Sequence, residues 1–378
     1  MAWLSRRPRQ VWRGVHCWLA WGLGPLFVLL GLTGSVLVFY TELDARLEPS
    51  LASARAAAEA HPVVAWQPVL TALEQAHSQR DQGWRIELPP DGRGLVTARY
   101  LRPPETAGAF FAPLVVTVQP HTGEVLASRF WGTFAMTWLF DLHYTLLAGD
   151  TGRSVLGWLG GVLLLLPVSG LLLWWPRAGH WRAALRWQRH ASPQRRHYDW
   201  HKALGLTSAG LLLLLTLTGV ALALPGVVEP LMRAWGPTLP MPRVALAREP
   251  GRALLSLDAA LAQVQRVFPE GVPRWIDTPA ADGAVLRVRL WLPGDPSQRF
   301  PRSYVWLNAH TGEVLALRDA RQQRGGEVGL AWLHPLHNGE AFGWVGRVLA
   351  CAAGWAPLGL GFTGWLRWRD RRRAGTRR

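Results

Sequence analysis

Four of the twelve histidines stand at positions that recur along the chain. His16 and His201 each precede a Thr-Gly pair by seventeen residues. His143 ends the segment "WLFDLH", and His337 ends the similar segment "WLHPLH". Two neutral imidazoles that face each other across an apolar gap can fill both axial positions of a haem iron, with the flat macrocycle packed between helices. We therefore predict that His16 pairs with His201 and His143 with His337, and that the pairs ligate one or two b-type haems.

Other histidines leave this assignment open. His334 lies three residues before His337 and can replace it as a ligand, and His197 lies four residues before His201 and can replace that one. The spacing of His197 and His201 also suits a metal, but no third ligand stands at a fixed spacing nearby, which argues against a zinc site. A histidine at a membrane surface can also simply contact headgroups and water, so the four positions do not by themselves require a cofactor.

Four uncharged stretches supply the helices that would position these histidines. Each is long enough to meet the threshold of roughly 18 apolar residues for crossing a bilayer. They cover residues 14–41, 154–176, 203–228 and 348–366. Because arginines and tryptophans flank them, we interpret them as membrane helices rather than buried helices of a soluble protein, and the first as an uncleaved anchor rather than a signal peptide.

The distribution of charge predicts the orientation of these helices. Residues 1–13, 177–202 and 367–378 hold 18 Lys and Arg against two Asp, which accounts for the whole formal net charge of +16. Under the positive-inside rule both termini and the 177–202 loop are cytoplasmic, and the remaining segments lie in the periplasm of a bacterial inner membrane. The basic segments are then topology anchors, so no nucleic-acid partner is indicated.

An identical heptamer, "HTGEVLA", occupies residues 121–127 and 310–316. Together with the repeated histidines it predicts an internal duplication, in which each half is a helix, an outer domain and a second helix. The outer domains cover residues 42–135 and 229–330, followed by interfacial segments at 136–153 and 331–347. The heptamer itself is typical of a hairpin, because its Gly can supply the positive φ that a tight turn requires. His121 and His310 are therefore expected to be turn residues.

These features resemble a known family. A helix followed by a strand and a "TGEVL" hairpin is similar to a PepSY domain. The "LTG" in the first and third membrane stretches resembles the PepSY-associated membrane proteins. That family is also described as iron-regulated inner-membrane proteins, and some members are similar to ferric-siderophore reductases. The resemblance implies an α+β membrane protein with four transmembrane helices in two duplicated halves, each with a periplasmic PepSY-like α+β domain inserted between its two helices. It also implies reduction of a ferric chelate.

Two function classes follow. The first is a haem protein that moves electrons across the membrane to a ferric siderophore or another iron chelate. The stretch "GLGFTG" at residues 359–364 lies inside a membrane helix and lacks the strand–helix context of a dinucleotide site, so no flavin or NAD site is found. Electrons would then come from a separate reductase or from quinol. The second is a non-enzymatic PepSY sensor or scaffold that binds peptides or regulates a protease in the periplasm. A transporter is disfavoured because the stretches contain no ionisable group apart from the boundary residue His16.

Overall fold

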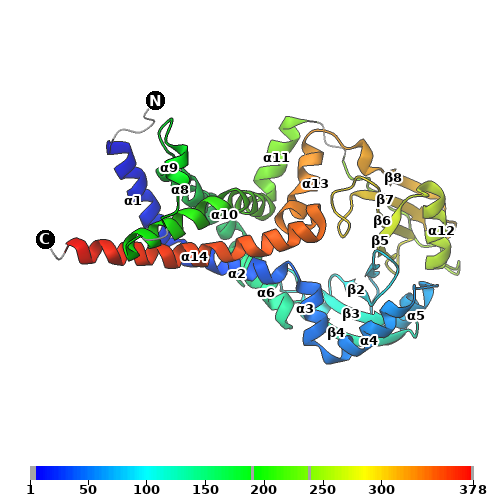
Figure 1. Ribbon diagram of the computed structural model, residues 1–378. Coiled ribbons are helices and arrows are strands. Elements are labelled where there is room, and N and C mark those ends of the chain that lie inside the picture. Colours follow the sequence, from blue (N-terminus) through cyan, green and yellow to red (C-terminus); the bar gives the residue numbers. More distant parts are fainter. Residues whose placement is uncertain (1–5, 189–190, 237–239, 376–378) are drawn as a thin grey trace. The chain divides into compact units, whose positions relative to one another are not determined.

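The computed structural model describes residues 6–188, 191–236 and 240–375. The chain forms two compact units (Figure 1). The membrane unit consists of residues 1–39, 142–227 and 336–378, and the sheet unit of residues 40–141 and 228–335. Both units are therefore assembled from segments that are far apart in the sequence.

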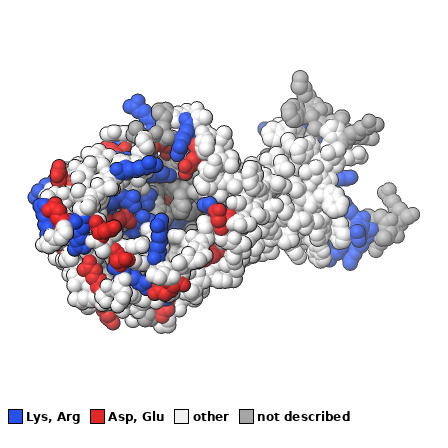
Figure 2. All heavy atoms as spheres, turned by 180° about the vertical axis from the view of Figure 1, so that it is seen from behind, with Lys and Arg blue, Asp and Glu red and all other residues white. Residues whose placement is uncertain are grey.

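Apolar helices make up the membrane unit. Within the described ranges, three helical stretches are long and apolar enough to cross a bilayer, and a bent pair of helices supplies a fourth if the pair is one span. The elements are α1 (Arg6–Gly22), α2 (Gly24–Leu37), α7 (Gly149–Leu163), α8 (Leu165–Trp174), α10 (Pro193–Ala223) and α14 (Gly343–Gly375), with the short α9 (Trp181–Leu185) between α8 and α10. The chain is thus a multi-pass membrane protein. On the face drawn in Figure 2 this unit carries little charge, and its Lys and Arg gather at one end.

The first span differs from the continuous helix that the sequence predicts for residues 14–41. Helices α1 and α2 meet at Leu23 with a bend of 60°. Pro25 explains the break, because a proline has no N–H to bond the carbonyl four residues earlier and its ring clashes with that carbonyl. Helix α2 ends at Leu37, and the next helix, α3 (Tyr40–Leu47), belongs to the sheet unit.

Helices α2 and α14 approach each other closely at two glycines. A Cβ added to Gly31 would collide with the backbone of Gly354, and one added to Gly354 would collide with Gly31 and Ser35. The Ser35 hydroxyl donates a hydrogen bond to the Cys351 carbonyl at 2.7 Å across the same contact. Gly354 therefore serves helix packing, as small residues commonly do in membranes, and leaves no space for a macrocycle at this point.

An eight-stranded antiparallel sheet forms the second unit, in the order β4-β3-β2-β1-β5-β6-β7-β8. Its strands are β1 (Arg85–Glu87), β2 (Val96–Tyr100), β3 (Leu114–Gln119), β4 (Glu124–Phe130), β5 (Val272–Asp277), β6 (Val285–Trp291), β7 (Ser303–Asn308) and β8 (Val314–Arg318). The sequence predicts a separate outer domain in each of two segments. In the structure each segment contributes four strands, and β1 pairs with β5 to make one sheet. This pairing covers two strand edges that would otherwise be exposed.

One face of the sheet carries the hydrophobic core. Residues that alternate along the strands, among them Ile86, Val116, Ile276 and Leu290, are fully buried under α5 (Gln67–Ala76) and α12 (Leu257–Val267). Each of these helices caps the other.

The reciprocal caps connect the two segments. The Asp258 carboxylate accepts hydrogen bonds from the backbone N–H groups of Trp66 and Gln67 at 2.7 and 3.0 Å, and the Gln67 side-chain oxygen accepts one from the N–H of Leu257 at 2.8 Å. Side-chain acceptors of this kind satisfy N–H groups that a helix start leaves unpaired.

Both copies of the repeated heptamer form hairpins, as the sequence predicts. They connect β3 to β4 and β7 to β8. Gly123 and Gly312 have φ values of +71° and +75°, which a residue with a side chain adopts only at a cost. His121 is exposed, whereas the His310 ring lies against the Ala253 carbonyl at 2.9 Å.

The remaining helices connect the sheet to the rest of the chain. They are α4 (Pro49–Ala60), α6 (Ala135–Thr145), α11 (Pro225–Trp235) and α13 (Gly326–His337). Helix α6 carries His143 in its last turn, and α13 ends on His337. After α6 the chain turns through Leu146 and Leu147 with positive φ, and after α13 it turns at Gly339. Helices α6 and α13 thus overlap the segments 136–153 and 331–347 that the sequence predicts to be interfacial, and the longer helices α7 and α14 begin within these segments, at Gly149 and Gly343.

Candidate functional site

The four histidines meet as two pairs within the membrane unit. The rings of His16 in α1 and His201 in α10 have centroids 6.3 Å apart and planes at 89°. The rings of His143 and His337 have centroids 6.2 Å apart and planes at 46°. The structure thus brings together the same residues that the sequence pairs.

These separations match two imidazoles on opposite sides of one metal ion. An imidazole nitrogen bonds a metal at about 2.0 Å and lies about 1.15 Å from its ring centre, so the two centroids of such a pair are about 6.3 Å apart. Aromatic rings in direct contact also have centroids about 4.5–7 Å apart, so the spacing fits a shared metal ion without requiring one. The two pairs nevertheless have it almost equally, at 6.3 and 6.2 Å.

A hydroxyl group holds the Nδ1 atom of each histidine in the His143/His337 pair. The Thr33 Oγ1 atom lies 2.8 Å from His143 Nδ1, and the Thr218 Oγ1 atom lies 3.1 Å from His337 Nδ1. The Leu215 carbonyl lies 3.0 Å from the same nitrogen of His337. Each ring is thereby oriented through its Nδ1 atom.

The His16/His201 pair has the same arrangement. The Ser169 Oγ atom lies 2.9 Å from His16 Nδ1, and the Thr363 Oγ1 atom lies 2.9 Å from His201 Nδ1. In all four cases the histidine and the hydroxyl come from different helices. Each histidine is therefore oriented by a Ser or Thr of a different helix.

The backbone fixes the direction of these hydrogen bonds. Each hydroxyl also lies within hydrogen-bond distance of a carbonyl in the preceding turn of its own helix, for example Thr33 with Leu29 at 2.8 Å and Thr363 with Gly359 at 2.8 Å. A hydroxyl has one proton to donate, and a carbonyl can only accept it. The hydroxyl oxygen must then accept from Nδ1–H, which leaves Nε2 unprotonated with a free lone pair. This is the tautomer that binds a metal, and orientation through the other nitrogen is the usual support of a metal-ligating histidine.

A glycine follows each of the four hydroxyl residues and lies against the same ring. A Cβ added to Gly34 or Gly219 would stand 3.0 Å from the Cε1 atom of His143 or His337. A Cβ added to Gly170 or Gly364 would stand 3.5 or 3.6 Å from Cε1 of His16 or His201. The four Ser/Thr-Gly pairs are thus small-residue seats for imidazole rings.

The two pairs lie far apart along α10. His201 belongs to one pair, and Thr218, seventeen residues later in the same helix, contacts the other pair. At 1.5 Å per residue this spacing is about 25 Å, close to the ~30 Å thickness of the hydrocarbon layer.

The two substitute ligands have other neighbours. The His334 ring packs edge-on against Phe300 at 4.9 Å in the sheet unit. The Nδ1 atom of His197 lies 2.7 Å from the Asp370 carboxylate. The structure therefore brings neither residue into a histidine pair.

Charged side chains surround the His16/His201 end of the unit. Lys202, a candidate partner for an anionic group, is buried in an ion pair with Asp199 at 3.1 Å. Arg367 stands one turn after Thr363 in α14, close enough to His16 and His201 for an electrostatic interaction, and its guanidinium lies over the Tyr198 ring at 4.9 Å. Arg367 is thus a cation at this pair that the sequence did not single out.

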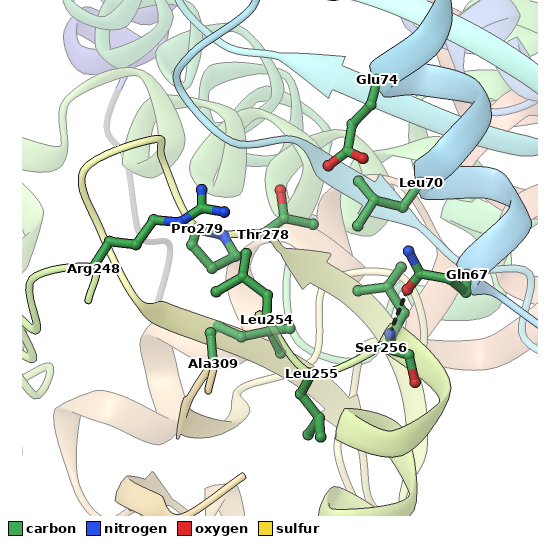
Figure 3. Close-up of a pocket in the computed structure, with 12 residues that line it drawn as sticks. Gln67, Leu70, Glu74, Arg248, Leu254, Leu255, Ser256, Thr278, Pro279 and Ala309 are labelled. Carbon is green, nitrogen blue, oxygen red and sulfur yellow. Dashed lines mark hydrogen bonds between the residues drawn. The ribbon is translucent and has the colours of Figure 1, made fainter. Parts of the chain in front are cut away.

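A cavity of about 310 Å³ lies in the sheet unit beside α5 (Figure 3). Leu70, Leu254 and Leu255 provide its apolar lining, with Glu74 and Arg248 also at its wall. Gln67 points toward it but is already bonded to the start of α12, as the dashed line in Figure 3 shows. The cavity contains none of the four paired histidines.

Sequence reasoning missed half of the hydroxyl–glycine seats. It recognised Thr-Gly in the first and third spans but not Ser169-Gly170 and Thr363-Gly364 in the second and fourth. A signal was present, because these two are 194 residues apart, the same offset that separates His143 from His337. Thr363-Gly364 also ends the "GLGFTG" stretch, which was considered above only as a dinucleotide site.

Comparison with known proteins places the chain in a family. A family model described as the PepSY-associated TM region matches residues 13–371. An uncharacterized protein of Pseudomonas aeruginosa is 30% identical over 195 residues, which cover 49% of this chain and 42% of that protein. The chain therefore matches less than half the length of this relative. Because the family model covers nearly the whole chain, the protein belongs to the family defined by the PepSY-associated TM region.

Proposed function

We propose that the His16/His201 and His143/His337 pairs each hold a b-type haem by its iron. The observation that carries the proposal is the pair geometry: centroids 6.2 to 6.3 Å apart, with every Nδ1 atom engaged by a hydroxyl from another helix. Each site offers two nitrogen ligands, which suits a metal whose other positions are filled by a macrocycle. A haem bound there supplies one-electron redox chemistry.

We propose further that this haem protein moves electrons across a bacterial inner membrane to reduce a ferric chelate, such as a siderophore complex, for iron uptake. The His16/His201 pair lies on the cytoplasmic side and the His143/His337 pair on the periplasmic side, with both termini cytoplasmic. The concentration of Lys and Arg at the end of α14 and in residues 177–202 supports this orientation. A separate reductase or quinol supplies the electrons.

The same proposal includes an internal duplication of helix, PepSY-like domain and helix. Three pairs of equivalent features support it: the two histidine pairs, the four Ser/Thr-Gly seats, and the two four-stranded halves of the sheet that meet at β1 and β5. Duplication explains why the ligands of each pair come from opposite halves of the chain.

Reoxidation of the reduced protein by a ferric chelate tests this function. The protein, purified in lipid nanodiscs after expression with added haem, is reduced anaerobically and mixed with the chelate, while a ferrous-iron indicator records the product. We expect the haem absorbance to return to the oxidised form as ferrous iron appears. The variant His143→Ala/His337→Ala should keep one haem and lose most of the rapid ferrous-iron production.

Two outcomes would contradict the proposal. Protein that folds but shows no haem absorbance would favour the non-enzymatic PepSY scaffold. Haem that stays reduced in the presence of ferric chelates would show that the protein binds haem but does not reduce these chelates.

A further inference from the structure

The face of the sheet opposite the hydrophobic core is unusually rich in arginine. Alternation along the strands places Arg99 of β2, Arg85 of β1, and Arg287 and Arg289 of β6 on this side, and Arg299 reaches it from the loop between β6 and β7. We call these five residues the arginine face. On the side drawn in Figure 2, Lys and Arg gather around a hollow in the sheet unit.

The strand register makes these residues neighbours. Arg85 stands directly opposite Arg99 on one side and Asp277 on the other, and Asp277 stands opposite Arg287. In the next row Glu87 stands opposite Trp275, and Trp275 opposite Arg289. Like charges directly opposite each other destabilise a sheet, so the Arg85–Arg99 pair is a cost that folding alone does not explain.

Two carboxylates neutralise only part of the arginine face. Glu87 pairs with Arg299 at 2.7 Å and with Arg99 at 3.6 Å. Asp277 pairs with Arg85 at 2.5 Å and with Arg287 at 2.6 Å. Five guanidinium groups against these two carboxylates leave an excess of three positive charges.

Arg289 is the centre of this excess. Its Nε atom donates to the Pro301 carbonyl at 2.5 Å, and among the described residues no carboxylate lies within ion-pair distance of it. Burial lowers the pKa of Arg289; Tyr304 and Asp277 oppose this shift, and Arg302 and Arg85 add to it. Asp295 also interacts electrostatically with Arg289 and with Arg302, so Arg302 and Asp295 together add one charge of each sign and leave the excess at three. The protein thus holds a half-buried cation beside other cations, where a bound anion would relieve both costs.

Aromatic rings lie between and beside the guanidinium groups. Arg99 stands over the Trp275 ring at 5.0 Å, and Arg289 over the Tyr304 ring at 5.1 Å. Phe300 stacks on Trp275 at 5.7 Å with planes at 16°. Trp275 and Tyr304 are buried, whereas Phe300 is partly exposed, so this surface presents guanidinium donors for oxygen anions and the Phe300 ring as a flat surface for an aryl group.

We propose that the arginine face binds an anionic metal chelate that carries aryl oxygen donors, such as catecholates. This inference rests on the proposed function and narrows its substrate: the ferric complex is negatively charged and aromatic rather than neutral and aliphatic. The excess positive charge matches the anion, and the partly exposed Phe300 ring, which stacks on the buried Trp275, matches an aryl group.

Binding of a gallium chelate tests this proposal without electron transfer. Gallium(III) has the charge and coordination of ferric iron but is not reduced under these conditions. The protein in nanodiscs is titrated with gallium tris-catecholate and, separately, with a neutral gallium trihydroxamate of similar size, and tryptophan fluorescence reports binding. We expect the catecholate complex to bind at least about tenfold more tightly, with an affinity that falls as salt rises.

Matched variants locate the binding surface. Arg289→Gln should weaken catecholate binding by about tenfold or more, since it removes charged hydrogen-bond donors. Arg266→Gln, on the exposed side of α12, should leave it unchanged. Unchanged thermal unfolding and haem absorbance in Arg289→Gln show that the variant is folded.

Three results would overturn the inference: equal binding of the neutral complex, full competition by inorganic phosphate at the same concentration, or wild-type affinity in a folded Arg289→Gln. None of these depends on haem. Loss of the proposed function would appear separately, as protein that binds the gallium complex but shows no haem absorbance.

Discussion

Adding one methyl group beside a histidine should weaken haem binding at one pair and leave it nearly unchanged at the other. In Gly219→Ala the new Cβ stands 3.0 Å from His337 Cε1, whereas in Gly364→Ala it stands 3.6 Å from His201 Cε1. Carbon atoms at ordinary contact are about 3.5 to 4.0 Å apart, so Gly219→Ala requires the ring or the helix to move by about 0.5 Å, and Gly364→Ala requires no movement.

The cost of this movement sets the expected effect. Overpacking a close contact costs about 1–3 kcal/mol, which corresponds to roughly 5- to 150-fold in haem affinity if the ring must shift to bind the iron. Gly364→Ala should change the affinity by less than about threefold, because its methyl group fills ordinary contact space. The two substitutions add the same methyl group but differ in how closely it approaches the histidine ring.

Haem titration measures the difference. Gly219→Ala is made in the background His16→Ala/His201→Ala, and Gly364→Ala in the background His143→Ala/His337→Ala, so that each protein has one complete histidine pair. Absorbance during titration of haem into the haem-free protein gives the affinity relative to each parent. If Gly219→Ala binds haem as tightly as its parent, the ring does not have to occupy the position next to Gly219, and the reasoning from the seats is refuted.

Three further predictions concern the support of the site and of the sheet. Thr218→Val removes the hydroxyl that orients His337 and should weaken haem binding at that pair by about 10- to 100-fold in a haem titration. The control Thr207→Val removes the same type of hydroxyl–carbonyl bond on the exposed side of α10 and should leave haem binding unchanged. The pKa of Glu87 lies below its usual value because its arginine neighbours outweigh the effect of burial. Glu87→Gln should therefore lower the free energy of unfolding by about 1–3 kcal/mol at pH 7, and this loss should shrink as the pH falls below about 4. The exposed Glu59→Gln should cost under about 0.5 kcal/mol in the same thermal unfolding series. Asp258→Ala removes the cap that connects the two halves of the sheet unit and should lower its melting temperature, by an amount equivalent to about 1–2 kcal/mol.

The pH dependence predicted for Glu87 follows from the direction of its pKa shift. A carboxylate whose pKa is lower in the folded than in the unfolded protein adds stability above the unfolded value of about 4.3. That contribution disappears as the pH falls through the pKa that the carboxylate has in the folded protein. A difference between Glu87→Gln and wild type that grew in acid would contradict the ion pairs assigned to this residue.

Patterns with a strong physical cause could be predicted from the sequence. The apolar stretches, the hairpin heptamers with Gly123 and Gly312, and the pairing of His16 with His201 and His143 with His337 all follow from periodicity, turn chemistry and repetition. Repetition was the most useful signal, because it singled out the four histidines that the structure brings together in pairs.

Features that depend on packing between distant segments could not be predicted. Pairing of β1 with β5 joins residues almost 200 positions apart, and only three residues of β1 take part. The Ser169 and Thr363 hydroxyls look like ordinary small polar residues of membrane helices until the helices are packed. The Gly-Leu-Gly-Pro sequence around Leu23 is typical of a helix break, but because the residues on both sides are apolar, the whole stretch was predicted to be one continuous span.

Electron paramagnetic resonance of the oxidised protein tests the central claim most directly, because the signal reports the axial ligands of a haem iron and the angle between their planes. Two distinct low-spin signals are predicted, one for each pair. The signal lost in His16→Ala/His201→Ala should be the more anisotropic, since the ring planes of that pair stand at 89° rather than 46°. Haem-free protein, or a spectrum in which both signals survive the replacement of one pair, would contradict the claim.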